Sequence, residues 1–409
     1  MKALVLAGGE PQIALIRELK KRGYCVILAD YSENPVARTY ADSFYQKSTL
    51  DIEAIRDIVK KENVDLIITV CTDQALNTVA VLADEFNLPT YISANTALTV
   101  TNKCLMKNIF YENHIPTSKY VIGKIDNVIK ESRKLVFPLV VKPADCNSSK
   151  GVTKVKNEKE LIIAVQNASI LSRTKEVIIE EFVQGNEVSV DAVVENGKAT
   201  ILAISDIYKI RNENSFVIYR AVCPANISSS IHLKIEKIVQ NIADAFGLIN
   251  APLLIQLIID GDKIHVIEFS ARTGGGEKHH MLQQLIDVDI IKETVDMMLG
   301  KKTKIMPKKQ NKFILNEFIY CDFGIFSHLE GFEELVKDGL IKEYHLFKIA
   351  GSKVGGAENS GDRVVGYTIC NNDLIELDRI NCEAVKRMKV LDINGKDIMR
   401  HDISTHLRK

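Results

Sequence analysis

The sequence has no excess of charge of either sign and no long hydrophobic run. Lysine plus arginine and aspartate plus glutamate both number 53, so no net field favours nucleic acid or an anionic membrane surface. No apolar run approaches the ~18 residues that a transmembrane helix needs. Residues 1–9 are typical of a strand and a turn rather than of a signal peptide. We therefore expect no nucleic-acid partner and no membrane association.

Paired or zinc-spaced cysteines are also missing. Eight cysteines are scattered along the chain without a C-x-x-C motif or a Cys/His spacing suited to zinc. Scattered thiols are typical of a reducing compartment, so the sequence predicts a cytoplasmic protein. With 409 residues, of which 46% are hydrophobic and 26% charged, the chain is long enough for about two or three globular domains.

The first hundred residues alternate between short aliphatic runs and helical patterns. Residues 2–7, 25–30 and 66–70 predict strands, and residues 75–86 predict one of the helices between and after them. Such alternation is typical of an open, mostly parallel sheet with helices on both faces. We expect an α/β domain over residues 1–98.

A glycine pair follows the first predicted strand. Gly8-Gly9, with Asp30 at the end of the second strand, is a partial match to a dinucleotide site, but the full G-x-G-x-x-G motif is absent. We therefore disfavour a nicotinamide cofactor. A tight turn, or close approach to a small substrate at the carboxyl edge of the sheet, explains the glycines better.

A lysine followed by a small, polar loop marks a second block. Residues 135–143 predict a buried strand that carries Lys142 near its end, and residues 145–152 predict a flexible loop. Backbone N–H groups and hydroxyls in such a loop can cover phosphates. The P-loop motif G-x-x-x-x-G-K-[ST] is absent, and a surface turn with a solvated lysine is the alternative.

An apolar strand that ends in acids comes next. Residues 177–183 contain Glu180, Glu181 and Phe182, and Glu187 follows after a short turn. The strand can serve as a hinge that binds an adenine, with a carboxylate just beyond it for the ribose hydroxyls. The alternative is an amphipathic strand whose acids face water.

Two later strands carry polar side chains that core packing would not select. Side chains alternate along a strand, so Glu268, Ser270 and Arg272 share one face, while Ile267 and Phe269 point into a core. With a three-residue loop at 261–263, Gln256 lies opposite Glu268. The carboxylate, amide and hydroxyl oxygens suit Mg²⁺, and the guanidinium suits a carboxylate or phosphate. A half-exposed hairpin is the alternative.

These pieces follow one another in a definite order. They are a strand with Lys-Pro, a Ser-Ser-x-Gly-Val loop, a Glu-Glu-Phe-Val hinge, Gly-x-Glu, and Gln…Glu-x-Ser-x-Arg. The order resembles the ATP-grasp superfamily, most of all the branch of carbamoyl-phosphate synthase and L-amino-acid ligases. The resemblance implies an α/β fold with an open parallel α/β domain (1–98), a two-lobe α+β ATP-grasp domain (99–306, mobile lobe 125–185) and a small β-rich C-terminal domain (307–409).

The resemblance also implies roles for individual residues. Phosphate contacts are implied for Lys103 and Lys142, and a cover over the phosphates for Ser148, Ser149, Gly151 and Val152. Adenine contacts are implied for Glu180, Phe182 and Val183, and a ribose contact for Glu187. The implied ligands of Mg²⁺ or Mn²⁺ are Gln256, Glu268 and Ser270, and Arg272 is placed at the transferred phosphoryl group. Ser270 departs from the family, which has asparagine there.

Substrate contacts are less well marked. Arg220 is the preferred binder of a substrate carboxylate, and the turn Gly274, Gly275 and Gly276 resembles one near the substrate carboxylate in amino-acid ligases. His279-His280 could bind a metal, but adjacent side chains diverge and no third ligand is evident in the sequence. We favour a substrate-loop role for the two histidines.

The activity that the resemblance implies is an ATP-dependent carboxylate–amine ligase. ATP converts a carboxylate into an acyl phosphate, whose leaving group is good, and an amine then displaces phosphate. We expect ADP and phosphate as products, and small-molecule carboxylate and amine substrates; a homodimer stays open. One alternative is activation of formate or bicarbonate for a small amine or nucleotide precursor. The other is a degenerate nucleotide-binding module, motivated by Ser270.

Overall fold

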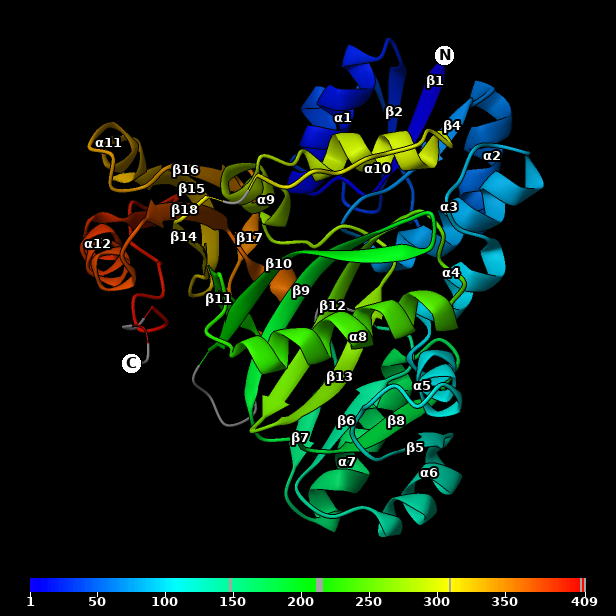
Figure 1. The fold of residues 1–409 in the computed structure, drawn as a ribbon. Coiled ribbons are helices and arrows are strands. Elements are labelled where there is room, and N and C mark those ends of the chain that lie inside the picture. Colours follow the sequence, from blue (N-terminus) through cyan, green and yellow to red (C-terminus); the bar gives the residue numbers. More distant parts are fainter. Residues whose placement is uncertain (147–148, 211–215, 309, 405–406, 408–409) are drawn as a thin grey trace.

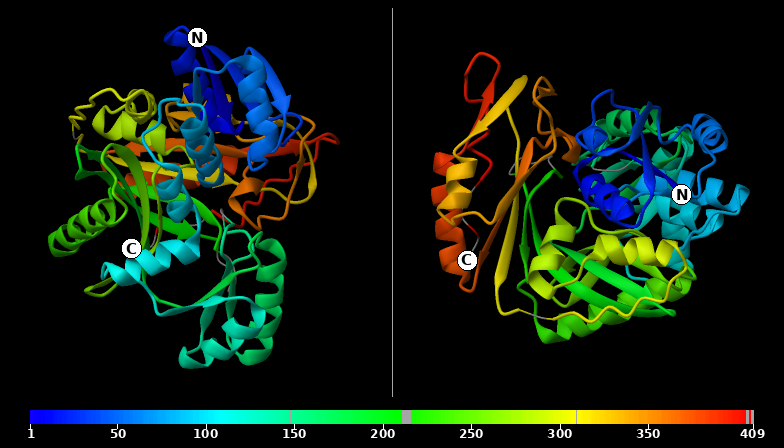
Figure 2. Two further views of the ribbon diagram at one scale, coloured as in Figure 1. Left: turned by 90° about the vertical axis from the view of Figure 1, so that its right-hand side faces the viewer. Right: turned by 90° about the horizontal axis from the view of Figure 1, so that it is seen from above.

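A computed structural model describes residues 1–146, 149–210, 216–308, 310–404 and 407 of the chain. Its centre is a large antiparallel sheet, with an α/β domain at one end and a smaller lobe at the other (Figures 1 and 2). No helix among these residues is long and apolar enough to cross a membrane.

The N-terminal domain is a parallel sheet with strand order β3-β2-β1-β4. Alternation of apolar strands and amphipathic helices produces it, and a prediction of an open parallel sheet is confirmed. The strands are β1 (Lys2–Leu6), β2 (Cys25–Asp30), β3 (Ser43–Gln46) and β4 (Leu66–Ile68). The helical segments are α1 (Glu10–Lys21), η1 (Arg38–Tyr40), α2 (Ile52–Glu62), α3 (Asp73–Glu85) and α4 (Ala94–Thr101).

A distant segment of the chain contributes part of the core of this domain. Helix α10 (Ile290–Met298) packs Ile291, Val295 and Met298 among the buried residues of the first hundred. Arg22 of the domain also forms an ion pair with Asp296 at 2.7 Å. The first 98 residues therefore share their core with a helix that lies, in the chain, between strands of the central sheet.

A four-stranded antiparallel sheet forms the smaller lobe, with strand order β5-β8-β6-β7 (lower part of Figure 1). It has its own apolar core, which includes the two helices. Its elements, reached through α5 (Lys103–Glu112), are β5 (Tyr120–Gly123), α6 (Ile125–Glu131), η2 (Ser132–Lys134), β6 (Leu139–Pro143), β7 (Thr153–Val155), α7 (Glu158–Leu171) and β8 (Val177–Glu181).

The central sheet has eight strands in the order β13-β12-β9-β10-β11-β14-β18-β16. Strands from beyond residue 306 thus continue it without a break. Its strands are β9 (Asn186–Glu195), β10 (Lys198–Lys209), β11 (Ile218–Cys223), β12 (Ala251–Asp260), β13 (Lys263–Ser270), β14 (Phe313–Ile319), β16 (Glu343–Leu346) and β18 (Val365–Asn371). Helices α8 (Ser229–Ala245) and α9 (Lys278–Ile286) pack against it.

The remainder of the C-terminal region is a small sheet, β17-β15-β19, with its helices. Its elements are β15 (Gly324–Glu330), α11 (Phe332–Lys337), β17 (Lys353–Val354), η3 (Ser360–Asp362), α12 (Leu374–Arg387) and β19 (Lys389–Asp392). The predicted domain boundary at residue 306 therefore falls between strands that belong to one continuous sheet. The boundary stays a prediction.

The hairpin of β12 and β13 differs from the expected geometry. Its turn is two residues long, because Asp260 pairs with Lys263 rather than with Ile264. A register shift further along the strands then brings Gln256 opposite Glu268, as predicted. The extra residue of this bulge turns Ile267 into the neighbouring cavity, so its predicted core position is wrong.

Candidate functional site

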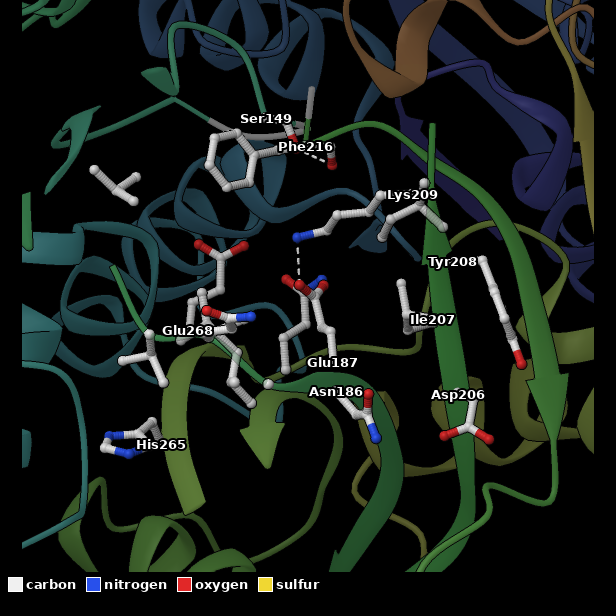
Figure 3. A pocket seen from close by; sticks show the side chains of 18 of the residues that line it. Ser149, Asn186, Glu187, Asp206, Ile207, Tyr208, Lys209, Phe216, His265 and Glu268 are labelled. Atoms are coloured by element: carbon white, nitrogen blue, oxygen red, sulfur yellow. Dashed lines mark hydrogen bonds and ion pairs between the residues drawn. The ribbon is translucent and has the colours of Figure 1, made fainter. Parts of the chain in front are cut away.

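A cavity of about 890 Å³ lies between the smaller lobe and the central sheet (Figure 3). Both parts of the molecule contribute polar side chains to it. Among its lining residues are Lys103, Val140, Lys142, Val152, Glu180, Phe182, Val183, Glu187, Lys209, Gln256 and Glu268. The structure therefore brings together most of the residues that the sequence singled out.

A buried carboxylate with two lysines forms the wall of the cavity on the lobe side. Glu180 on β8 is only 4% exposed and forms ion pairs with Lys107, at 2.6 Å, and with Lys142. Burial alone would raise the pKa of Glu180, but the charges of the two lysines together outweigh burial and lower that pKa to about 2. The carboxylate is thus occupied by lysines, and adenine contact by this residue stays a prediction.

Lysine 107 was missed by the sequence analysis. It lies one helical turn after Lys103, at position i+4 on α5, so both face the same side of the helix. That spacing was the signal that could have found it.

Lys103 links the loop after β6, which begins at Ala144, to the central sheet. Its Nζ donates to the backbone oxygen of Cys146 at 2.6 Å and lies 3.3 Å from the carboxylate of Glu268. Burial lowers the pKa of Lys103, but the nearby carboxylates of Glu268 and Asp73 outweigh this and raise it. The lysine is therefore charged and already neutralises Glu268.

A smaller hollow beside this cavity contains the other predicted groups. Gln256, Glu268, Ser270 and Arg272 all line it, together with Asp73. Nε and Nη2 of Arg272 each donate to Asp73 at 2.7 Å, and Nη1 donates to the backbone oxygen of Thr273. These three hydrogen bonds fix the orientation of the guanidinium group.

Asp73 is a second residue that the sequence analysis missed. It begins α3, directly after the turn that follows β4 of the parallel sheet. Ligand sites of α/β sheets lie at the carboxyl ends of the strands, so its place after a strand was the available signal. Its partner Arg272 is 199 residues away in the chain, and no sequence pattern marks that pairing.

The loop after β6 contacts the opposite side of the cavity through Ser149. Oγ of Ser149 donates to the backbone oxygen of Phe216 at 3.2 Å (Figure 3). Gly151 has φ +74°, and a Cβ there would lie 2.6 Å from Leu171, so glycine is required. Ser148 lies outside the described residues.

Two further lysines, Lys154 and Lys209, also line this cavity. Lys154 lies 3.6 Å from the centre of the Phe182 ring, and Lys209 forms an ion pair with Glu187 (Figure 3). To bind ribose hydroxyls, the carboxylate of Glu187 therefore has to release Lys209 or to contact both groups at once.

The prediction that Arg220 binds a substrate carboxylate is wrong. Its side chain is fully buried and forms an ion pair with Glu317 and a 3.0 Å hydrogen bond to Ser404. Strand β11 lies inside the central sheet, between β10 and β14, so the arginine packs against neighbouring strands instead of reaching the cavity.

Tight packing accounts for two of the three consecutive glycines. A Cβ at Gly274 would lie 2.4 Å from Asp191, and one at Gly276 would lie 2.8 Å from Phe318. Gly275 is more open, with Cys71 as its nearest neighbour at 3.7 Å. A substrate contact by this turn stays a prediction.

Residues 135–280 match the family model described as an ATP-grasp domain. This match confirms the predicted resemblance to the ATP-grasp superfamily over these residues. The predicted fold class is confirmed, since solved members cover nearly the whole chain. The L-amino acid ligase from Bacillus licheniformis superposes with a TM-score of 0.78 at 20% identity, covering 96% of this chain and 98% of that one.

Two relatives that match by sequence are enzymes of different kinds. The chain is 24% identical over 294 residues to the carbamoyl phosphate synthase large chain of Clostridium botulinum (strain Langeland), which covers 70% of this chain but 27% of that protein. It is 25% identical over 280 residues to the formate-dependent phosphoribosylglycinamide formyltransferase of Saccharolobus solfataricus, covering 66% of this chain and 69% of that one. The chain thus spans about a quarter of the length of the synthase.

Replacing Glu180 with glutamine should change how stability depends on pH. The pKa of Glu180 is lowered from 4.5 to about 2, so its stabilising effect is complete above pH 4.5 and is lost as the pH falls toward 2. We expect Glu180→Gln to lose on the order of 3 kcal/mol at neutral pH and to flatten the acid limb. Urea unfolding between neutral and acidic pH measures both effects.

The exposed Glu158→Gln on α7 of the same lobe is the matched control, and we expect it to keep the wild-type profile. An unchanged acid limb in Glu180→Gln would show that this carboxylate is not ionised between the lysines.

Proposed function

We propose that the protein is an ATP-dependent carboxylate–amine ligase that works through an acyl phosphate and releases ADP and phosphate. One observation supports this most strongly. Lys103 and Lys142 line one cavity in which Glu268 and Glu180 are their acidic partners, and the buried Lys107 also pairs with Glu180. Three ammonium groups against two carboxylates leave a net positive wall, which suits a triphosphate.

Lys142 can exchange its carboxylate partner for a phosphate group at little electrostatic cost. Glu180 is shared between Lys107 and Lys142, so Lys142 can leave it while Lys107 continues to neutralise the buried acid. Breaking an isolated buried pair would instead leave an uncompensated charge. We therefore assign phosphate binding to Lys142 and Lys103, and a supporting role to Lys107.

The oxygen donors on the hairpin fit a divalent metal. Glu268 already lies 3.3 Å from a cation, the ammonium of Lys103, and Gln256 faces it across the strands. Mg²⁺ or Mn²⁺ brought by the nucleotide would lie on these two oxygens, with Ser270 nearby, and would neutralise phosphate charge. Lys103 is then free to contact phosphate oxygens.

Arg272 is the group that we place at the transferring phosphoryl. Three of its five N–H groups are used by Asp73 and Thr273, so two remain for a ligand. Because Asp73 holds the guanidinium in one plane, no reorientation is needed when charge develops on the phosphoryl oxygens. Asp73 is thus a positioning residue.

Closure of the smaller lobe protects the intermediate. The lobe has its own core, and Ser149 near its loop tip contacts the opposite wall through Phe216. Closure over ATP would exclude water, which otherwise hydrolyses an acyl phosphate.

The alternative acceptor classes have support of their own. The relative from Saccharolobus solfataricus, a formate-dependent enzyme, matches two thirds of this chain, which favours formate activation as the second candidate. The fold shared with an L-amino acid ligase favours free amino acids. We propose small-molecule substrates in either case.

Substrate dependence of phosphate release distinguishes these activities. The full chain is incubated with ATP, Mg²⁺ and pairs of amino acids, and in parallel with formate or bicarbonate and small amines. We expect ADP and phosphate to form only when a free amino acid is present. Turnover with formate or bicarbonate and none with amino acids would contradict the proposed ligase.

Lys142→Ala should lower the rate of ADP formation about 100- to 1000-fold, since one charge that stabilises the transition state is lost. Lys159→Ala removes an exposed lysine from α7 of the same lobe, and we expect it to behave as wild type. A steady-state assay with both variants checks this. Equal rates for wild type and Lys142→Ala would exclude the assigned phosphate site.

A further inference from the structure

A cluster of histidines and carboxylates lies outside the nucleotide cavity. Glu10 begins α1, His279 and His280 lie in the first turn of α9, and His345 lies on β16 (Figure 1). These segments come from the N-terminal domain, the loop after Arg272 and the C-terminal region. The fold alone brings them together.

The donor atoms of this cluster are close to one another. One ligand atom each from Glu10, His280 and His345 lies within 4.8 Å of the other two. Nε2 of His280 lies 3.2 Å from Oε1 of Glu10, and Nε2 of His279 lies 3.8 Å from the same oxygen. The adjacent histidines do not diverge, because both rings face the same carboxylate.

Several buried atoms in the cluster lack partners. Among the described residues, neither ring nitrogen of His279 forms a hydrogen bond, and neither does Oε2 of Glu10. Both side chains are more than nine-tenths buried. A buried polar atom left without a partner destabilises the fold, so these atoms point to a ligand.

A further carboxylate supports the cluster from behind. Glu277 is fully buried, and its Oε1 lies 3.2 Å from Nδ1 of His345. A Cβ at Gly366 would come within 2.5 Å of that oxygen, so the neighbouring strand needs glycine to make room. A carboxylate bonded to one nitrogen of a histidine is the usual way in which proteins orient a metal-binding imidazole.

We propose that Glu10, His280 and His345, with His279 as a fourth donor, bind a divalent transition metal such as Zn²⁺. Imidazoles outnumber carboxylates here, which favours Zn²⁺, Co²⁺ or Ni²⁺ over Mg²⁺. Donors around tetrahedral zinc lie about 3.4 Å apart. The rings of His280 and His345 are stacked at 4.0 Å with an interplanar angle of 8°, so they have to turn for their nitrogens to converge on the ion. The metal would tie three distant segments together and stabilise the turn that follows Arg272.

Cobalt binding to the chelator-treated full chain, in the absence of nucleotide, tests this site. We expect one Co²⁺ per chain, with the visible absorption of a tetrahedral or five-coordinate ion, and displacement of Co²⁺ by Zn²⁺. His280→Ala and His345→Ala should abolish the absorption. The exposed His328→Ala is the matched control and should keep it.

A second measurement covers variants that fold poorly. Glu277→Gln keeps the size of the side chain and should weaken Co²⁺ binding about 10- to 100-fold, as loss of a supporting carboxylate does in metal sites. Wild type should also unfold at a higher temperature with Zn²⁺, and His345→Ala should not. All variants keep the eight cysteines, so equal metal binding in every variant would mean thiol ligation and overturn the proposal. No binding to wild type would overturn it too.

Discussion

A bidentate ion pair between Asp73 and Arg272 connects the two parts of the molecule on which the proposed chemistry depends. Asp73 starts a helix of the N-terminal domain, and Arg272 follows the last strand of the hairpin of β12 and β13. Buried ion pairs add little net stability compared with apolar contacts, so the pair is better explained by function. It fixes the orientation of the guanidinium group and brings the carboxyl edge of the parallel sheet against the hollow lined by Arg272.

Other charged side chains of the cavity are also held in ion pairs. Each lysine predicted to bind phosphate already has an acid: Lys142 has Glu180, and Lys103 has Glu268. These acids hold the two lysine side chains at the cavity. When nucleotide and metal bind, the pairs can be exchanged one for one, so the site gains an anion without leaving a buried charge alone.

The sequence predicted those parts of the site that depend on local patterns. Strand–helix alternation indicated the parallel sheet, and the ordered motifs from Lys142 to Arg272 indicated one site, which the structure divides between a cavity and a smaller hollow beside it. Gln256 and Glu268 do face each other, although through a short turn and a bulge that strand alternation does not encode.

Contacts between distant segments could not be predicted in this way. The partners of Arg272, Arg220 and His280 lie 199, 97 and 270 residues away in the chain. Arg220 was misplaced because an arginine on a strand carries no local sign that Glu317 will bury it. The two adjacent histidines were set aside for the same reason, since Glu10 and His345 reach them only in the folded molecule.

Oxygen transfer from substrate to phosphate tests the acyl-phosphate route most directly. With the carboxylate substrate labelled by ¹⁸O in its carboxyl group, a single-turnover reaction is followed by mass spectrometry of the released phosphate. Attack of a carboxylate oxygen on the terminal phosphoryl group predicts one labelled oxygen in inorganic phosphate, with ADP as the only nucleotide product. Label in AMP together with pyrophosphate release, or phosphate without label, would contradict the account.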